Sequence, residues 1–461
     1  MLTYQDFIAE PKRAEFIRRL INEHNSSELV RTARIADLYD RQRNVTINEY
    51  IQKVYSTSGL AVEDYVASNN KIASNFFRRL NTQRNTYLLG NGVTFSSDNN
   101  GQIKARLGEK FDANIKRAGY LGLIHGLSFV FWNLNHTHVF PVTEFAPLWD
   151  EIDGILRAGV RYWQLDADKP MTAVLYEEDG YTTYRTDKSG VDLIEAEPKR
   201  AYVRTYSKAP ADSQAAIIGE SNYSALPIVP LWGSSLHQST LIGIRQAIDS
   251  YDLVRSGFAN DLQDCAQIYW LLENYGGMTN ADLAQFRDRI KLQHIAVADT
   301  SEGGKVQGYT QDVPYQARQT YLDGIRAGIY EDFGALDVHV VAAGATNDHI
   351  EAAYQPMDEQ ADDYEYQLIE CIQQILKLAG QPDNVQPLFK RNRIANQREI
   401  VEMLMLSAEY LDDETIISKL PFVSPDEIQS ILDRRSVEQQ SRIKREASLD
   451  GAPEDGLEDD V

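Results

Sequence analysis

The sequence predicts an α+β protein in which mainly helical parts flank an antiparallel β region. Residues 241–270 repeat apolar side chains at steps of three and four, as one face of a long helix does. A second seam of this kind follows Pro314. Between residues 128 and 207, short segments rich in β-branched and aromatic residues alternate with turn signals such as Glu178-Asp179-Gly180.

The N-terminal part is predicted to be helical, with amphipathic turns at 14–23 and 27–39. Near Asn44 the pattern becomes strand-like or irregular. A strong helix is expected over 62–89, because a broad apolar face ends at the glycines of Leu89-Gly90-Asn91-Gly92, and glycine readily adopts a left-handed cap. The elements expected between that helix and the β region are a strand at Val93–Phe95 and a helix at Arg106–Leu123.

Two long helices are expected to form a hairpin after the β region. Pro314 suits the first turn of the second helix, where its missing N–H would be unpaired anyway. About forty residues separate the two helices, too many for a simple loop. We therefore expect a small α/β module, with a short helix capped by Asn280 and two strand-like pieces, LQHIAVAD and KVQGYTQD. The two helical seams consist of Ile244, Ile248, Tyr251, Phe258, Leu262 and Cys265, and of Leu322, Ile325, Ile329 and Phe333.

An apolar, glycine-punctuated loop then leads into a helix predicted from about Asn347 to Leu378. Pro356 interrupts this helix and predicts a kink, since proline removes a hydrogen bond and crowds the preceding turn. Gly380 is expected to end it. The C-terminal third is predicted to hold three helices, at Ala395–Tyr410, Asp412–Leu420 and Pro425–Lys444, the last with a capping box at its start.

Composition and motifs argue against several classes of protein. The 461 residues include 46 Lys and Arg against 68 Asp and Glu, and the net charge of -22 would repel nucleic acid at long range. No apolar run approaches the ~20 residues of a membrane helix, and no signal peptide is apparent. HExxH, Cys/His ligand spacing, GxSxG and a complete phosphate-binding loop are all missing from the sequence. We therefore expect neither an enzyme nor a bound metal or other cofactor.

Several stretches of the chain, taken in order, match the pattern of one known family. The N-terminal ones are Asn69-Asn70-Lys71-Ile72, Asn75-Phe76-Phe77 and Tyr87-Leu88-Leu89-Gly90-Asn91 leading into Val93-Thr94-Phe95. The later ones are LPIVPLW at 226–232, AIDSYDLVRSGFANDL at 247–262 and ETIISKLPFVSPDEIQSIL at 414–432. Together they resemble the portal proteins of tailed double-stranded DNA bacteriophages, most closely the SPP1-type group, over nearly the whole chain.

This resemblance implies a portal fold with a mainly helical wing, stem and crown, an antiparallel β region in the wing and a small α/β clip. Portals of this kind are rings, dodecameric in the virion, that lie at one capsid vertex and pass DNA through an axial channel. The implied parts are wing 1–238, first stem helix 239–270, clip 271–313, second stem helix 314–336, tunnel loop 337–349, kinked wing helix and connection 350–394, crown helices 395–445 and disordered acidic tail 446–461.

The resemblance also implies site residues and partners. In such a channel, the acid-rich helix face with Glu351, Asp358 and Glu359 is our own hypothesis for an acidic channel face, which would guide DNA without gripping it, since many basic contacts to phosphates would hold a duplex tightly. The DNA-facing tunnel loop would contain Val340, Val341, Ala342, Ala343, Gly344, Ala345, Thr346 and Asn347. The clip residues expected to dock the large terminase subunit, and later a head-completion or adaptor protein, are Asn280, Asp282, Arg287 and Arg289. The chain would also contact its own copies, the major capsid protein and scaffolding protein, would assemble in the host cytoplasm and would need no membrane.

Two other classes of function stay open. A soluble enzyme with a carboxylate-based site would gather acids of the β region, near Glu144, Asp150 and Glu151, and would be active as a monomer. A non-conducting structural head–tail adaptor would keep the ring but would not pass DNA.

Overall fold

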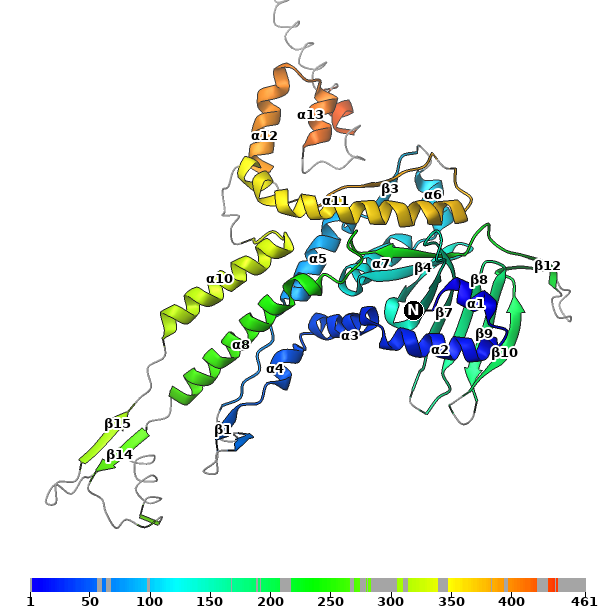
Figure 1. The fold of residues 1–461 in the computed structure, drawn as a ribbon. Coiled ribbons are helices and arrows are strands. Elements are labelled where there is room, and N and C mark those ends of the chain that lie inside the picture. Colours follow the sequence, from blue (N-terminus) through cyan, green and yellow to red (C-terminus); the bar gives the residue numbers. More distant parts are fainter. Residues whose placement is uncertain are drawn as a thin grey trace, which may run out of the picture. The chain divides into compact units, whose positions relative to one another are not determined.

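The computed structural model shows an α+β chain that divides into two compact units (Figure 1). The first contains Met1–Ala335 and Pro356–Asn392, and the second contains Leu336–Gln355 and Arg393–Val461. The structure describes residues 2–55, 60–63, 68–97, 100–166, 168–187, 190, 192–207, 217–265, 269–273, 279, 281–282, 305–309, 314–338, 347–382, 384–393, 397–420, 430–435 and 437.

The N-terminal helices of the first unit are largely as predicted. Their bounds are α1 Tyr4–Ala9, α2 Arg13–Ser26, α3 Glu28–Asp40 and α4 Val45–Glu49. A capping box between Thr3 and Asp6 begins α1. The expectation of a strand-like or irregular stretch after Asn44 was wrong, because the Asn44 side chain accepts a hydrogen bond from the Ile47 N–H and so begins α4.

The helix expected over 62–89 is shorter than predicted. Ala61–Glu63 is strand β2, which pairs with β1 at Lys53–Tyr55, and helix α5 covers only Phe76–Leu89. Before α5, the N–H groups of Asn70, Ile72 and Ser74 donate to side chains of a distant helix. These donors are therefore not available for helical hydrogen bonds, which explains why the chain stays extended there.

The helix expected over 106–123 is two helices, α6 at Asn100–Leu107 and α7 at Phe111–His125. Gly108 separates them with a φ of +90°. A side chain at this position would collide with the carbonyl oxygen of Asn135, so both the backbone angle and the close approach require glycine.

The antiparallel β region is confirmed and forms two main sheets within the described part of the chain. A five-stranded sheet has the order β10-β9-β8-β7-β6, and a three-stranded sheet has the order β13-β4-β5. The strands are β4 Leu127–Asn133, β5 His136–Pro141, β6 Phe145–Trp149, β7 Leu156–Trp163, β8 Thr172–Glu177, β9 Gly180–Thr186, β10 Leu193–Arg200 and β13 Ile228–Trp232, with the 3-10 turn η1 at Val142–Glu144. Two smaller ladders pair β11 Val203–Tyr206 with β12 Ile217–Ser221, and β3 Val93–Phe95 with β16 Pro387–Phe389.

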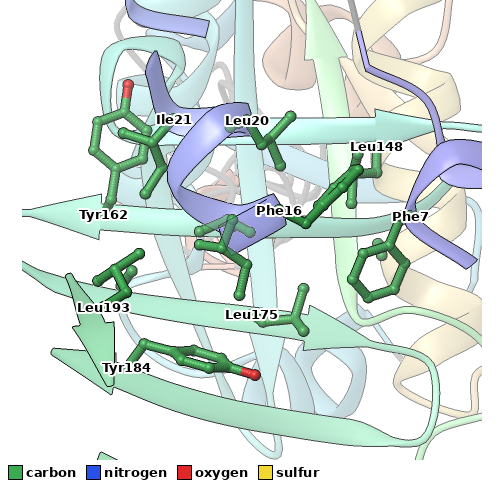
Figure 2. Close-up of a cluster of buried hydrophobic side chains, with 14 residues drawn as sticks. Phe7, Phe16, Leu20, Ile21, Leu148, Tyr162, Leu175, Tyr184 and Leu193 are labelled. Atoms are coloured by element: carbon green, nitrogen blue, oxygen red, sulfur yellow. The ribbon is translucent and has the colours of Figure 1, made fainter. Parts of the chain in front are cut away.

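Helices α1 and α2 cover one face of the five-stranded sheet (Figure 1). In Figure 2, Phe16 and Leu20 of α2 and Phe7 of α1 lie against Leu148 and Leu175 of the sheet. Each of these side chains is at most 2% exposed. Burial of such a side chain contributes about 1.5–3 kcal/mol, so the N-terminal helices fix this sheet as a stable platform.

The predicted long helices are α8 at Leu241–Cys265 and α10 at Tyr315–Phe333, which lie side by side (Figure 1). Ile244, Ile248 and Ile329 are buried between them and their neighbours, as the seams predicted. Leu262 departs from the prediction, since it is 53% exposed.

The module between the long helices begins with a strand, so the first helix ends earlier than expected. Strand β14, Tyr269–Glu273, pairs with β15, Lys305–Tyr309. Strand β15 lies within the expected strand KVQGYTQD, and its partner β14 begins inside the stretch 241–270 that we expected to be helical. The other expected strand, LQHIAVAD, lies outside the described residues.

Helix α11 covers Asn347–Leu378 and continues through Pro356, so the expected kink stays a prediction. Gly380 follows it with a φ of +72°, as expected of a helix end. The second unit also contains α12 Gln397–Leu406, the 3-10 turn η2 Ser407–Glu409 and α13 Asp413–Lys419, capped by Asp412. Of the last predicted helix, residues 430–435 are helical and its capping box lies outside the described residues.

Candidate functional site

One polar stripe of α8 binds the extended segment before α5. Its acceptors, Asp252, Ser256 and Asn260, lie one turn apart, and the donors are the N–H groups of alternate residues of the segment. The pairs are Ser74 to Asp252 at 2.9 Å, Ile72 to Ser256 at 3.0 Å and Asn70 to Asn260 at 2.6 Å. Part of the family-like stretch Asn69-Asn70-Lys71-Ile72 therefore holds the chain along the first long helix.

Asp252 is the buried end of this stripe. Its side chain is fully buried and also accepts a hydrogen bond from the Asn44 side-chain amide at 2.8 Å. Burial raises the pKa of Asp252, although hydrogen bonds from Asn44 and Ser74 partly oppose that shift. The carboxyl group thus joins α4, α8 and the extended segment in the core of the first unit.

The predicted acidic face of α11 contains an arginine-bound cluster within the first unit. The Arg391 guanidinium lies 2.6 Å from Asp358 and 3.2 Å from Glu365, and it also binds Asp362. The Asp358 carboxylate accepts a further hydrogen bond from the Tyr87 hydroxyl at 2.5 Å. Burial lowers the pKa of Arg391, but the hydrogen bonds to the three acids outweigh it and raise that pKa above its ordinary value.

The other two residues of the predicted acidic face have different surroundings. Glu359 is exposed on α11 of the first unit. Glu351 belongs to the second unit, where its side chain is 77% exposed and lies 4.0 Å from Arg393. The Arg393 guanidinium also lies 5.7 Å from the ring centre of Tyr354.

Most residues predicted to face DNA or to dock partners lie outside the described part of the chain. Val340, Val341, Ala342, Ala343, Gly344, Ala345 and Thr346 lie outside the described residues, and Asn347 is the first residue of α11. Asn280, Arg287 and Arg289 also lie outside them.

Asp282 is the one predicted docking residue whose contacts are described. Its carboxylate accepts hydrogen bonds from the Thr279 hydroxyl at 2.7 Å and the Thr279 N–H at 2.9 Å. These bonds hold the pKa of Asp282 below its usual value. Thr279 thus makes the capping contacts that we expected of Asn280, and the Asp282 carboxylate takes part in the cap.

The acids of the β region that a carboxylate-based enzyme would use make polar contacts within the scaffold. The Asp150 and Glu151 carboxylates accept hydrogen bonds from side chains at the N-terminus, and Glu144 pairs with an arginine of β7. The contacts are Gln5 to Asp150 at 2.8 Å, Thr3 to Glu151 at 2.7 Å and Arg161 to Glu144 at 3.7 Å. Among the described residues, no group of three or more His, Cys, Asp or Glu side chains could hold a metal ion, and no helix is long and apolar enough to cross a bilayer.

Sequence reasoning missed the polar stripe of α8 and the buried Arg84 of α5. The stripe has a visible signal, since Asp252, Ser256 and Asn260 recur at four-residue spacing along the helix. Arg84 has no such signal, because its partner, the carbonyl of Phe333, is a backbone group far along the chain.

Comparison with known proteins gives consistent matches over nearly the whole chain. Residues 18–446 match the family model described as phage portal protein, SPP1 Gp6-like. The chain is 24% identical to the portal protein of Bacillus phage SPP1, in an alignment that covers 98% of this chain and 92% of that protein. It is 23% identical to the portal protein of Clostridium phage phiCD119, over 77% of this chain and 82% of that protein. The chain therefore belongs to the SPP1-type family of phage portal proteins.

Proposed function

We propose that copies of this chain form a ring, dodecameric in the virion, at one vertex of the capsid. Double-stranded DNA passes through the axial channel of the ring during packaging and again during ejection. The observation that carries the proposal is the family match over residues 18–446, which spans the long helices, the module between them and the C-terminal helices.

Each part of the chain then has a proposed role. Helices α8 and α10 form the stem, and α8, with 25 residues, is roughly 37 Å long. The ladder of β14 and β15 belongs to the clip, the two main sheets and α11 from Ile350 onward belong to the wing, and α12 and α13 belong to the crown. The acidic segment 446–461 is the proposed solvated tail.

The channel is proposed to guide DNA through repulsion and weak contacts. Acidic side chains release no counterions from the duplex, so a phosphate backbone slides past them without being held. Exposed Glu359 and Glu351 suit this role, together with the uncharged residues of the tunnel loop at 340–347. Asp358 suits it less well, because Arg391 and Tyr87 already bind its carboxylate.

The clip is proposed to dock the large terminase subunit during packaging and a head-completion or adaptor protein afterwards. Asn280, Asp282, Arg287 and Arg289 are the candidate contacts, and the Asp282 carboxylate already accepts hydrogen bonds from Thr279. The capsid and scaffolding proteins are the proposed partners during assembly in the host cytoplasm. ATP hydrolysis belongs to the terminase, so the portal itself acts as a structural protein and not as an enzyme.

Native mass spectrometry with negative-stain images of the same sample tests the ring. We expect about a dozen chains around a hole wider than a ~20 Å duplex. A chain that stays monomeric at high concentration, both alone and with its scaffolding protein, would refute the proposal. A ring that assembles into capsids but packages no DNA would support the non-conducting adaptor instead.

The charge argument has its own test in a packaging assay. Glu359→Lys places a cation on the proposed channel face, and we expect slower packaging at low salt that recovers as salt is added. Glu195→Lys makes the same charge change at an exposed position of β10 and serves as the control. Equal rates for both variants at every salt concentration would show that the Glu359 charge has no part in DNA passage.

A further inference from the structure

Helix α5 holds the end of α10 through a buried arginine. Arg84 is only 7% exposed, and its guanidinium donates a hydrogen bond to the carbonyl oxygen of Phe333, the last residue of α10. The central carbon of this guanidinium lies 4.1 Å from the centre of the Phe333 ring. Burial lowers the pKa of Arg84 to about 10, which still leaves the side chain charged at neutral pH. A cation at this end of a helix stabilises its unpaired carbonyl groups.

Gly334 brings the end of α10 against α11. It caps α10 with a φ of +63°, and the N–H of Ala335 bonds back to the carbonyl of Tyr330 at 2.9 Å. A Cβ atom at Gly334 would lie 2.8 Å from Cγ of Gln360 and 3.1 Å from the carbonyl oxygen of Pro356. The chain therefore leaves the first unit after Ala335 and re-enters it at Pro356 at nearly the same place.

Tyr87, one turn after Arg84 on α5, holds the point of re-entry. Its hydroxyl donates to Asp358, two residues beyond Pro356. Its carbonyl oxygen accepts a hydrogen bond from the N–H of Asn392 at 2.8 Å, and the neighbouring Arg391 binds the same Asp358 carboxylate. Tyr87 thus stabilises the re-entry both directly and through the Arg391 cluster.

We infer that Arg84 and Tyr87 are positioning residues that clamp the two ends of the excursion Leu336–Gln355. The excursion contains the whole proposed tunnel loop, 337–349, and any effect of the clamp on that loop rests on the proposed function. The clamp fixes the points at which the chain leaves and re-enters the first unit, and a segment whose two ends are held close together has less conformational freedom than one with a free end. The charge of Arg84 holds one end and the hydroxyl of Tyr87 holds the other.

Hydrogen exchange of the purified chain tests the clamp, with Arg84→Met as the main variant. Methionine keeps an apolar side chain against Phe333 but removes the charge and the donor. We expect exchange to become about tenfold faster or more at amides 330–338 and 350–358, because the contacts that close this region are lost. Arg84→Lys keeps a cation and should restore much of the protection, whereas a purely packing role would be served equally by methionine.

Three further variants complete the experiment. Tyr87→Phe should speed exchange mainly at 356–360, and Gly334→Ala should open both ends while leaving Arg84 unchanged. Arg78→Met changes an exposed arginine of the same helix and should leave exchange unchanged. If Arg84→Met and Tyr87→Phe exchange like Arg78→Met, or if lysine restores nothing at position 84, the clamp is refuted.

The clamp and the proposed function can fail separately. Exchange is measured before any DNA or partner is present, so it reports the clamp alone. In a packaging assay, Arg84→Met rings should package more slowly than Arg78→Met rings. A chain that shows the expected exchange but forms no ring would refute the proposed function and leave the clamp in place.

Discussion

Replacing Asp358 by alanine tests whether the acidic face of α11 is a structural anchor or a free surface. The variant removes the 2.6 Å ion pair with Arg391 and the 2.5 Å hydrogen bond from Tyr87. Both side chains of the ion pair are mostly buried, since Arg391 is 25% exposed and Asp358 is 20% exposed. Glu359→Ala is the matched control, because it removes an acid from the next position of the same helix, where the side chain is exposed.

The structure gives the expected size of the effect. A hydrogen bond to a charged group contributes about 1.5–3 kcal/mol. Arg391 still binds Asp362 and Glu365 in the variant, so the stabilisation lost with its bond to Asp358 lies at the low end of that range. We expect Asp358→Ala to lower the free energy of unfolding by about 3 kcal/mol, and Glu359→Ala to change it by less than about 0.5 kcal/mol.

Thermal unfolding of the two variants, followed by circular dichroism, measures this difference. At roughly 2–4 °C per kcal/mol, Asp358→Ala should unfold several degrees below the control. If the two variants unfold within about 1 °C of each other, the Arg391 cluster does not stabilise the first unit. The full acidic face would then again be available to the proposed channel.

Three further outcomes follow from the first unit. Asp252→Ala should lower the free energy of unfolding by about 2–5 kcal/mol, because the N–H of Ser74 and the side-chain amide of Asn44 lose their buried acceptor. Faster hydrogen exchange of the amides at 68–75 in this variant would check the prediction. The raised pKa of Asp252 means that its contribution to stability is present below its unfolded pKa and is lost as pH rises through the folded value. The urea midpoint of the native chain should therefore fall relative to that of Asp252→Asn as pH rises above the ordinary pKa of an aspartate. Gly126→Ala should lower the melting temperature, because its Cβ would lie 2.8 Å from the Gln238 backbone at a φ of +88°, whereas Gly243→Ala, with open space in α8, should not.

Periodicity predicted the helices whose hydrogen bonds are internal. The apolar seams placed Ile244, Ile248 and Ile329 correctly in the core, because a helix face that packs on neighbours must repeat at three and four residues. Pattern reasoning failed at 62–75, where Asp252, Ser256 and Asn260 of α8 take the backbone donors. No local pattern reports acceptors that lie about 180 residues away in the chain, as the separation of Ser74 and Asp252 illustrates.

The candidate site was predicted only as far as local chemistry allows. The run of acids on α11 was visible in the sequence, but the sequence did not show that Arg391 binds three of them. Charge pattern identifies a polar face and is silent about its partners, which here lie 26–33 residues further along the chain. For this reason Asp358 is better explained as an anchor, and Glu359 is the more informative position for a test of the channel.

Some apolar side chains of the long helices are exposed, and the sequence pattern did not predict which ones. Periodicity shows that a helix face avoids water, but it does not show which chain covers that face. Leu262 continues the buried seam of α8 and is nevertheless 53% exposed, as is Tyr321 of α10. In the proposed ring, each pair of long helices lies beside the pair of a neighbouring copy, and side chains of this kind are the ones that such a contact would bury. If the proposed ring forms, Leu262 should therefore become less exposed on assembly.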